Sequence, residues 1–171
     1  IEYEVRNNLL TNFDAFLIFD LPIRNYIKNE LFSHTIGYLG IPNQDEINNF
    51  QNALGNNQVG KNGLERYYED YLSGIPGELI FLGSEIIDSK QPIPGGDLFL
   101  SIDSSTQYVT KESLQQGIDL ANKSFESINE IKRGASVVLD IETGNIVSMV
   151  SLPDFNPNKF VSGISDFEYK Q

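Results

Sequence analysis

The strongest constraint on the fold is a run near the middle of the chain, Pro92-Ile93-Pro94-Gly95-Gly96. Proline lacks an amide hydrogen and has a fixed φ angle, and glycine disfavours regular structure, so neither a helix nor a central strand is expected to continue through this run. The chain is therefore expected to divide near it, into residues 1–91 and 92–171. A chain of 171 residues with 40% apolar residues is typical of a folded protein.

Charge and composition exclude several function classes. Lys and Arg total 12 against 24 Asp and Glu, so the formal net charge is −12 and nucleic acid is not an expected partner. Cysteine is absent, which excludes disulfides, thiolate metal sites and thiol nucleophiles. No apolar run approaches the roughly 20 residues that span a bilayer. Any membrane anchor is therefore expected to lie outside this chain. Because the sequence begins with Ile1 instead of Met, we also expect a segment of a longer protein.

The first part of the chain changes character after residue 40. Residues 1–40 are rich in β-branched and aromatic residues, including the apolar run Phe16–Phe19, and predict strand and loop. Asn43 then predicts the start of a short amphipathic helix with acidic residues in its first turn, and Gly55 predicts its end.

The clearest periodicity predicts a second helix, closed by Gly74. Its apolar stripe, expected to pack on a core, is Leu64, Tyr67, Tyr68, Tyr71 and Leu72. Its opposite face, expected to be exposed, carries Glu65, Arg66, Glu69 and Asp70. Two short strands, Glu78–Leu82 and Glu85–Ile87, follow around Gly83 and predict a hairpin.

Beyond the proline-glycine run, the pattern alternates between strand and helix. Leu98–Ile102 predicts a strand, and Asp103 or Ser104 is expected to cap a helix over residues 104–125. The apolar edge of this helix is Leu114, Ile118, Ala121 and Phe125. The runs Ala135–Leu139 and Ile146–Val150 then predict a hairpin. Both runs are almost wholly apolar, so we expect strands covered on both faces, with the helix as one cover. The overall fold class is α+β.

The residue types that carry chemistry are sparse. His34 is the single histidine and has no cysteine beside it, so a structural or surface role is expected rather than a metal site or a catalytic base. The glycine pairs at 37 and 40, and at 60 and 63, do not have the spacing of phosphate-binding loops. Carboxylate pairs such as Glu65 and Glu69 are explained by helix faces and caps. No catalytic, cofactor-binding or metal-binding residue is predicted.

Four stretches, in order along the chain, carry a resemblance to a known family. They are Arg24-Asn25-Tyr26 with Ser33–Gly40, Val59–Glu65 with Leu72–Gly77, Pro94–Asp103 with Gln107, and Gly134–Asp140 with Thr143-Gly144 and Pro153–Asn158. Together they resemble the class B penicillin-binding proteins, which are bacterial cell-wall DD-transpeptidases. The second stretch is similar to that family's G-x-x-G-x-E helix. Ile27 stands where the family's R-x-Y-P motif has proline.

The resemblance implies a dimerisation or pedestal module over residues 1–91 and the N-terminal part of a transpeptidase domain over residues 92–171. The residues that match structural motifs are Arg24, Gly37, Gly40, Gly60, Gly63, Glu65, Gly74, Gly77, Asp103, Gln107, Asp140 and Gly144. The family's catalytic motifs S-x-x-K and K-[ST]-G do not occur, and Ser127-Ile128-Asn129 matches S-x-N by chance. The chain itself is therefore expected to be a non-catalytic scaffold that does not react with β-lactams.

The resemblance also implies partners and a location. The expected partners are the remainder of the same transpeptidase domain and other cell-wall synthesis proteins. With only part of that domain present, the strands at 135–150 are expected to expose faces that its C-terminal helices normally cover, which favours self-association. The parent protein is expected to be extracytoplasmic and anchored in the membrane. Two alternatives remain open: a degenerate, stand-alone binding module of the cell-wall machinery, and an unrelated hydrolase that uses His34 or a carboxylate pair.

Overall fold

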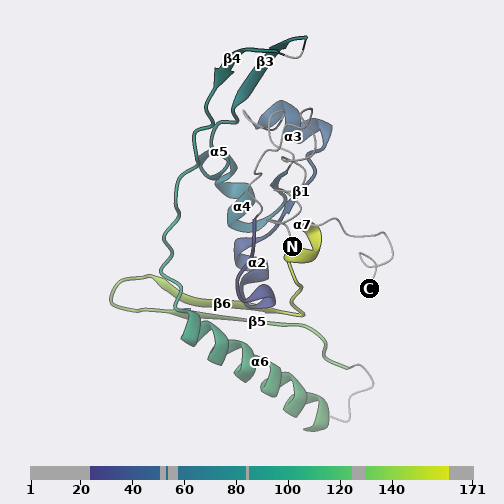
Figure 1. Ribbon diagram of the computed structural model, residues 1–171. Coiled ribbons are helices and arrows are strands. Elements are labelled where there is room, and N and C mark those ends of the chain that lie inside the picture. The colour runs from purple at the N-terminus through teal and green to yellow at the C-terminus, as the bar shows by residue number, and fades with distance from the viewer. Residues whose placement is uncertain (1–23, 51–52, 54–57, 84, 125–129, 162–171) are drawn as a thin grey trace, which may run out of the picture.

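The computed structural model describes residues 24–50, 53, 58–83, 85–124 and 130–161. Figure 1 shows a body of short helices and strands that lies on one side of a long, flat hairpin, with a long helix on the hairpin's other side. We refer to residues 24–72 as the N-terminal body and to residues 104–152 as the helix–hairpin layer. A second hairpin projects from the body. The described residues combine helices with strands that pair only antiparallel, which confirms the predicted α+β class.

The N-terminal body is built from very short elements. In chain order they are the 3₁₀ helix η1 (Asn29–Phe32), α2 (Ser33–Ile36), β1 (Leu39–Gly40), α3 (Gln44–Asn49), β2 (Val59–Gly60), α4 (Gly63–Tyr67) and α5 (Glu69–Leu72). β1 pairs with β2 antiparallel. Because single turns of helix are unstable alone, tertiary contacts must hold these elements in place.

The prediction of strand and loop over residues 1–40 is wrong for residues 29–36, which form η1 and α2. The β-branched and aromatic content of this stretch favours strands. Side chains of α2, however, bond to the backbone of β6 and of the segment that follows it, and these contacts outweigh the local preference. The predicted apolar run Phe16–Phe19 lies outside the described residues. α3 begins after Asn43 as predicted, but it ends at Asn49, because Phe50 is already extended.

The predicted helix with a tyrosine stripe differs from the structure in two ways. It is interrupted at Tyr68, which separates α4 from α5. The burial of its faces also differs: Tyr67, expected to be buried, is 78% exposed, whereas Glu65 and Glu69, expected to be exposed, are each 4% exposed. Arg66 and Asp70 are exposed as predicted. The physical reason is that hydrogen-bond partners for both glutamate carboxylates lie on the inner side, so burial follows the partners and not the hydropathy of the side chains.

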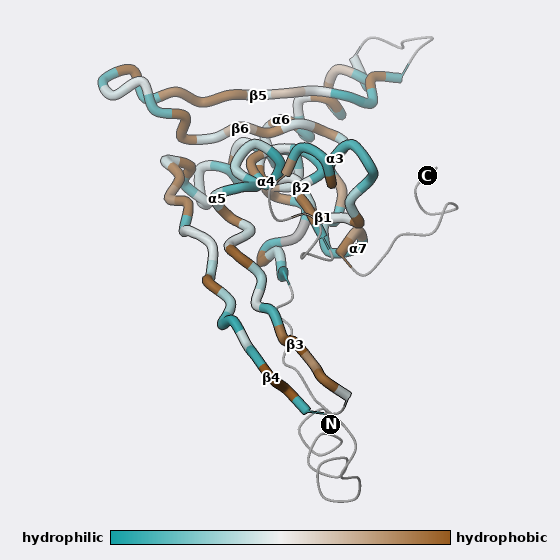
Figure 2. The backbone as a smooth tube through the Cα atoms, turned by 90° about the horizontal axis from the view of Figure 1, so that it is seen from above, coloured by the Kyte–Doolittle hydropathy of each residue, from teal (hydrophilic) through white to brown (hydrophobic). Residues whose placement is uncertain are grey.

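The predicted hairpin near residue 80 is confirmed, as β3 (Glu78–Leu82) paired with β4 (Glu85–Lys90), and β4 extends beyond the predicted Ile87. Figure 2 shows this ribbon projecting from the body, with brown, apolar residues along it. Every described residue of both strands is exposed. The body therefore leaves this hairpin largely uncovered.

The predicted strand Leu98–Ile102 is not a strand. Phe99 is 93% exposed, and the segment is held at two points by the next hairpin, since Ser101 Oγ donates to the carbonyl of Ile146 (2.7 Å) and Asp103 N donates to the carbonyl of Val147 (2.9 Å). Two isolated bonds do not make a strand ladder. An apolar run without a partner strand was therefore misread from the sequence.

The helix–hairpin layer consists of α6 (Ser104–Ser124), β5 (Gly134–Leu139) and β6 (Ile146–Leu152). Asp103 caps α6, because its Oδ1 accepts from the amide of Thr106 (2.7 Å), as one of the two predicted caps. This bond and a second one from the Thr106 hydroxyl (2.7 Å) hold the pKa of Asp103 below its ordinary value. The core of the layer is Ile118, Val150, Leu152 and Leu114. Phe125 of the predicted apolar edge lies outside the described residues.

The predicted hairpin β5–β6 is confirmed, with Val137 opposite Met149. Asp140 Oδ1 accepts from the amide of Glu142 (2.9 Å), and Gly144 adopts a positive φ of 74° in the connecting turn. The expectation that both strands are covered on both faces is wrong for β5, whose residues Val137 to Leu139 are exposed. In the described residues α6 covers only one face of the hairpin.

After β6 the chain returns to the N-terminal body. α7 (Asn158–Val161) lies beside β1, and the ring of Phe160 stacks on Tyr38 with centroids 4.0 Å apart. The amide of Tyr26 donates to Asn158 Oδ1 (2.9 Å). No helix among the described residues has the length and apolar character needed to cross a membrane.

Candidate functional site

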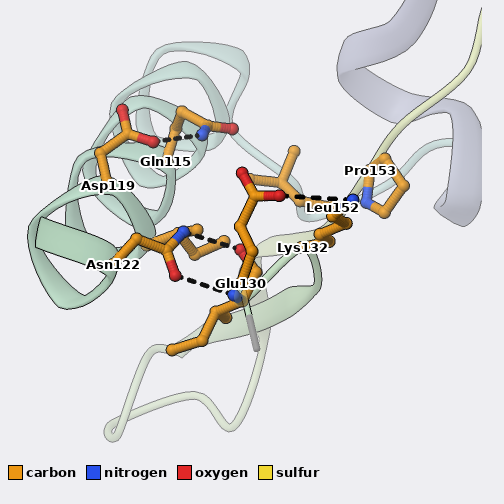
Figure 3. Close-up of a pocket in the computed structure, with 9 residues that line it drawn as sticks. Gln115, Asp119, Asn122, Glu130, Lys132, Leu152 and Pro153 are labelled. Carbon is orange, nitrogen blue, oxygen red and sulfur yellow. Dashed lines mark hydrogen bonds and ion pairs between the residues drawn. The ribbon is translucent and has the colours of Figure 1, made fainter. Parts of the chain in front are cut away.

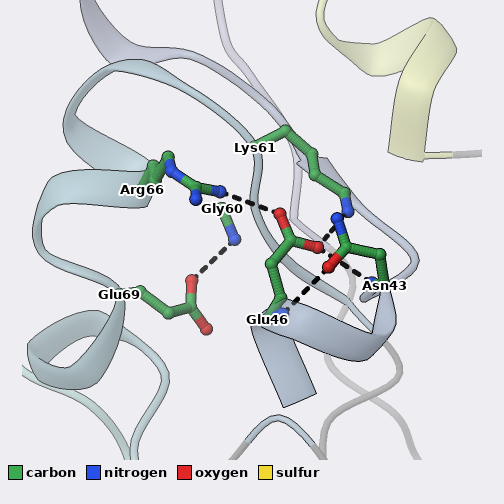
Figure 4. A network of polar contacts seen from close by, with 6 residues as sticks. All are labelled: Asn43, Glu46, Gly60, Lys61, Arg66 and Glu69. Atoms are coloured by element: carbon green, nitrogen blue, oxygen red, sulfur yellow. Dashed lines mark hydrogen bonds and ion pairs between the residues drawn. The ribbon is translucent and has the colours of Figure 1, made fainter. Parts of the chain in front are cut away.

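Glu46 forms the centre of a buried polar network in the N-terminal body (Figure 4). It sits at the third position of α3, where Asn43 and Glu46 form a capping box, each side chain accepting from the other's backbone amide at 2.9 Å. Lys61 Nζ and Arg66 Nη1 (2.8 Å) donate to its two carboxylate oxygens. Burial alone would raise the pKa of Glu46, but these donors outweigh it and hold the pKa below its ordinary value.

Glu65, in α4, ties the beginning of the described chain to the body. Arg24 lies beside its carboxylate, with Nε 3.0 Å from Oε1 and Nη2 3.2 Å from Oε2. The hydroxyl of Tyr26 also donates to Oε1, at 3.1 Å. Burial, together with the negative charge of Glu65, raises the pKa of Tyr26 above its ordinary value, so this hydroxyl stays a donor. Two residues of the R-x-Y sequence thus meet one glutamate.

Glu69, in α5, is buried as deeply as Glu46 but has a different partner. Its Oε2 accepts from the amide of Gly60 in β2, at 2.7 Å. Within the described residues no cation forms an ion pair with it. Burial and the nearby charges of Glu65 and Asp70 raise its pKa, and the bond from the Gly60 amide only partly offsets them. The ionised form of the Glu69 carboxylate is therefore less stable in the folded chain than it would be in water.

Two glycines let the loop before α4 approach α2 closely. Gly37 has a φ of +87°, and a Cβ added there would lie 2.0 Å from the carbonyl oxygen of Asn62. Gly63 has a φ of +61°, and a Cβ there would lie 2.7 Å from the carbonyl of Ile36. A larger residue at either position would have to push the two segments apart. These glycines are structural, as their motif match implies.

Gln107 joins three segments of the chain. This side chain of α6 is 1% exposed, and its Nε2 donates to the carbonyls of Leu31 in η1 (3.0 Å) and Met149 in β6 (2.8 Å). Its Oε1 accepts from Ser148 Oγ and from the amide of Met149, each at 2.9 Å. All four hydrogen-bonding positions of the carboxamide are thus occupied. One bond reaches the N-terminal body and three stay within the helix–hairpin layer.

α2 reinforces the same contact from the body side. Thr35 Oγ1 donates to the carbonyl of Met149 (3.3 Å), His34 Nε2 bonds to the carbonyl of Pro153 (2.9 Å), and Ser33 Oγ accepts from the amide of Phe155 (3.4 Å). The His34 ring also meets the Phe155 ring edge to face, with centroids 5.1 Å apart. His34 therefore binds backbone and a ring, in line with the structural role expected from the sequence.

One open cavity of about 310 Å³ lies between α6 and the end of β6 (Figure 3). Its polar groups pair with one another or with nearby backbone: Gln115 donates to Asp119 (3.0 Å), and Asn122 exchanges two hydrogen bonds with the backbone of Ile131. In the part of the chain that the structure describes, no three histidine, aspartate or glutamate side chains are arranged to hold a metal ion. The cavity thus shows no group aimed at a ligand.

The motif residues named from the sequence fall into three places. Arg24, Gly37, Gly40, Gly60, Gly63 and Glu65 lie in the N-terminal body, Gly74 and Gly77 lie between α5 and β3, and Asp103, Gln107, Asp140 and Gly144 lie in or beside the helix–hairpin layer. The structure brings Arg24 and Glu65 into contact. Sequence reasoning missed Glu46 and Glu69. The spacing Asn43-x-x-Glu46 is the capping-box signal that would have indicated the first of them.

Comparison with known proteins identifies the class. The family model of the penicillin-binding protein dimerisation domain matches residues 3–100, which is more than half of the chain. The chain belongs to this family, and the resemblance inferred from its motifs is confirmed.

Individual relatives are named as a peptidoglycan transpeptidase and as a penicillin-binding protein. The peptidoglycan D,D-transpeptidase MrdA of Acinetobacter baumannii is 37% identical over 154 residues, which is 85% of this chain and 21% of the relative. Penicillin-binding protein 3 of Bacillus subtilis is 31% identical over 152 residues, 86% of this chain and 20% of the relative. The chain thus spans only about a fifth of the length of these relatives.

Solved structures agree with the sequence relatives. A crystal structure of PBP2 from Pseudomonas aeruginosa in complex with WCK 5153 superposes with a TM-score of 0.65 at 34% identity, covering 91% of this chain and 29% of that one. PBP2 from Helicobacter pylori, in a complex with MreC, superposes with a TM-score of 0.68 at 26% identity, covering 98% and 30%. Residues 3–100 of the chain therefore correspond to the dimerisation domain of a penicillin-binding protein.

Proposed function

We propose that this chain is a non-catalytic scaffold segment of a peptidoglycan transpeptidase, with a pedestal module over residues 1–91 and the N-terminal part of the transpeptidase domain over residues 92–171. The observation that carries the proposal is the use of the buried acids. Each of Glu46, Glu65 and Glu69 has its carboxylate bound to backbone, tyrosine or basic side chains of the same body. Acids held in this way fix loops in place and are not free for acid or base chemistry.

The motif residues have an architectural role in this proposal. Arg24 and Glu65 hold the start of the described chain, the glycines allow close approach of loops, and Asp103 and Asp140 fix a helix start and a turn. In the parent protein the nucleophilic serine would lie downstream of residue 171. The parent would act outside the cytoplasm and would be tethered to the membrane by a segment outside this chain.

The proposed partners are the rest of the same transpeptidase domain and other cell-wall synthesis proteins. An MreC-type protein is the first candidate among the latter, since a PBP2 relative has been solved with MreC. The exposed residues Val137 to Leu139 of β5 are the proposed contact for the remaining transpeptidase domain, because an apolar strand left uncovered favours association.

Labelling with fluorescent penicillin tests the proposal. This chain is compared with the same chain extended by the next few hundred residues of its reading frame. We expect label on the extended protein only, since the catalytic motifs do not occur in the 171 residues. Label on the short chain would overturn its non-catalytic role. Label on neither protein would favour a degenerate binding module, and titration of the short chain with purified MreC from the same bacterium would then test partner binding directly.

A further inference from the structure

The edge of β6 that faces away from β5 is closed by a side chain instead of a strand. Both backbone groups of Met149 bond to the Gln107 carboxamide, the amide to Oε1 and the carbonyl to Nε2. A neighbouring strand would offer the same pair of one acceptor and one donor. Gln107 therefore occupies, with a single side chain, the position that a third strand would take beside Met149.

The same carboxamide also reaches out of its own layer. The second hydrogen of Nε2 goes to the carbonyl of Leu31 in η1, 76 residues away along the chain. Thr35 of α2 donates to the Met149 carbonyl as well, so two side chains from different segments converge on one acceptor. Figure 1 shows α2 standing on β6 at this place.

We propose that Gln107 is a positioning residue that locks the N-terminal body to the helix–hairpin layer, and that its two amide hydrogens form the lock while its oxygen serves the layer alone. The division follows from the bonding pattern. The oxygen bonds only to Ser148 and Met149, both in β6, whereas the nitrogen joins β6 to η1.

The substitution Gln107→Glu distinguishes the donor bonds of this side chain from its acceptor bonds. A carboxylate has almost the same shape and keeps both acceptor bonds, but it has no hydrogen for Leu31 or for the Met149 carbonyl, and it places negative charge against both carbonyl oxygens. The two acceptor bonds, from Ser148 and from the Met149 amide, should therefore persist, while the bonds to the Met149 carbonyl and to Leu31 of the body are lost. Gln116→Glu, on an exposed position of the same helix, is the matched control, because it makes the same change of charge outside the junction.

Amide hydrogen exchange of the full 171-residue chain, followed by NMR, measures the contact with the body and the bonding within the layer separately. The amide of Phe155 bonds to Ser33, and the amide of Tyr26 bonds to Asn158, so both join the body to the segment that follows β6. The amide of Met149 bonds inside the layer. In Gln107→Glu we expect exchange at Tyr26 and Phe155 to become at least about tenfold faster, with Met149 changed by less than about twofold. Gln116→Glu should change none of the three.

Equal acceleration at all three amides would overturn the proposal, because it would mean a general loss of stability, and no acceleration would overturn it as well. If Gln107→Glu does not fold, Thr35→Val provides the second test. It removes one donor to the Met149 carbonyl and leaves the Gln107 carboxamide in place, so the same two amides should accelerate by a smaller factor.

The consequence for the parent enzyme rests on the proposed function. There the lock would set the orientation of the transpeptidase domain, so Gln107→Glu in the extended protein should slow penicillin labelling severalfold, while Gln116→Glu should not. Unchanged labelling would overturn this consequence. If the unsubstituted extended protein takes no label, the proposed function fails instead, and the exchange experiment still decides whether the lock exists.

Discussion

Glu46, Glu65 and Glu69 of the N-terminal body are each only 4% exposed, whereas Leu82, near the turn of the β3–β4 hairpin, is 71% exposed. Hydropathy alone would have placed these residues the other way round. The acids are inside because amides, a tyrosine and cations surround them, and the hairpin is outside because the described residues offer it no cover. In the body, polar partners decide burial, and in the hairpin local strand pairing decides structure without burial.

The largest effect is expected from removing Glu65. In Glu65→Ala the Tyr26 hydroxyl, inside the body, loses its acceptor, and Arg24 loses its counter-charge. We expect the free energy of unfolding at pH 7 to fall by about 3 kcal/mol, as measured by urea denaturation. Glu112→Ala, on an exposed position of α6, is the control and should stay within about 0.5 kcal/mol. Equal losses in the two variants would show that the buried network adds nothing.

A smaller and pH-dependent loss is expected for Glu46→Gln. The amide can still accept from the Asn43 amide, but it has no charge for Lys61 and Arg66, so we expect a loss of about 2 kcal/mol at pH 7. Folding lowers the pKa of Glu46 below the value of this carboxyl in the unfolded chain, ordinarily 4.5. Its charge therefore stabilises the fold at pH values above 4.5, and this stabilisation is lost as the pH falls through the pKa of Glu46 in the folded chain.

Urea denaturation of the two proteins at pH 7 and at pH 3 checks this sign. The difference between the unsubstituted chain and Glu46→Gln should shrink on acidification. A difference that stays constant with pH would mean that the lost stability comes from packing around the side chain and not from its charge.

Local signals in the sequence were sufficient for several elements. Asn43, Asp103 and the turn at Asp140 each bond to residues two or three positions away, so their roles can be recognised without knowledge of the fold. The faces of α4 and α5 could not be predicted in this way. Arg24 and Tyr26, the partners of Glu65, lie 41 and 39 residues away, and a helical stripe of tyrosines gives no indication of them. Burial of long-range polar pairs is information that hydrophobic periodicity does not contain.

Removing the charge of Glu69 should change the free energy of unfolding in the opposite direction to removing the charge of Glu46. Its pKa is raised by folding, so the folded chain binds its proton more tightly, and stability decreases as the pH rises from the ordinary value of 4.5 through the folded value. Glu69→Gln removes the charge but keeps an acceptor for the Gly60 amide. We expect the free energy of unfolding, measured by urea denaturation, to increase at pH 7 and to change little at pH 4. A loss at pH 7 would mean that the Gly60 bond requires a full negative charge.

The smallest effect is expected on the exposed hairpin. Leu82→Ala should change the free energy of unfolding by less than about 0.5 kcal/mol, since the side chain is already in water, whereas Leu152→Ala, the same change at an 8% exposed position in β6, should cost about 2 kcal/mol or more. Urea denaturation at two protein concentrations checks both. If Leu82→Ala costs as much as Leu152→Ala, and more at the higher concentration, then a second copy of the chain covers the hairpin in solution, and its exposure reflects the single chain and not the assembly.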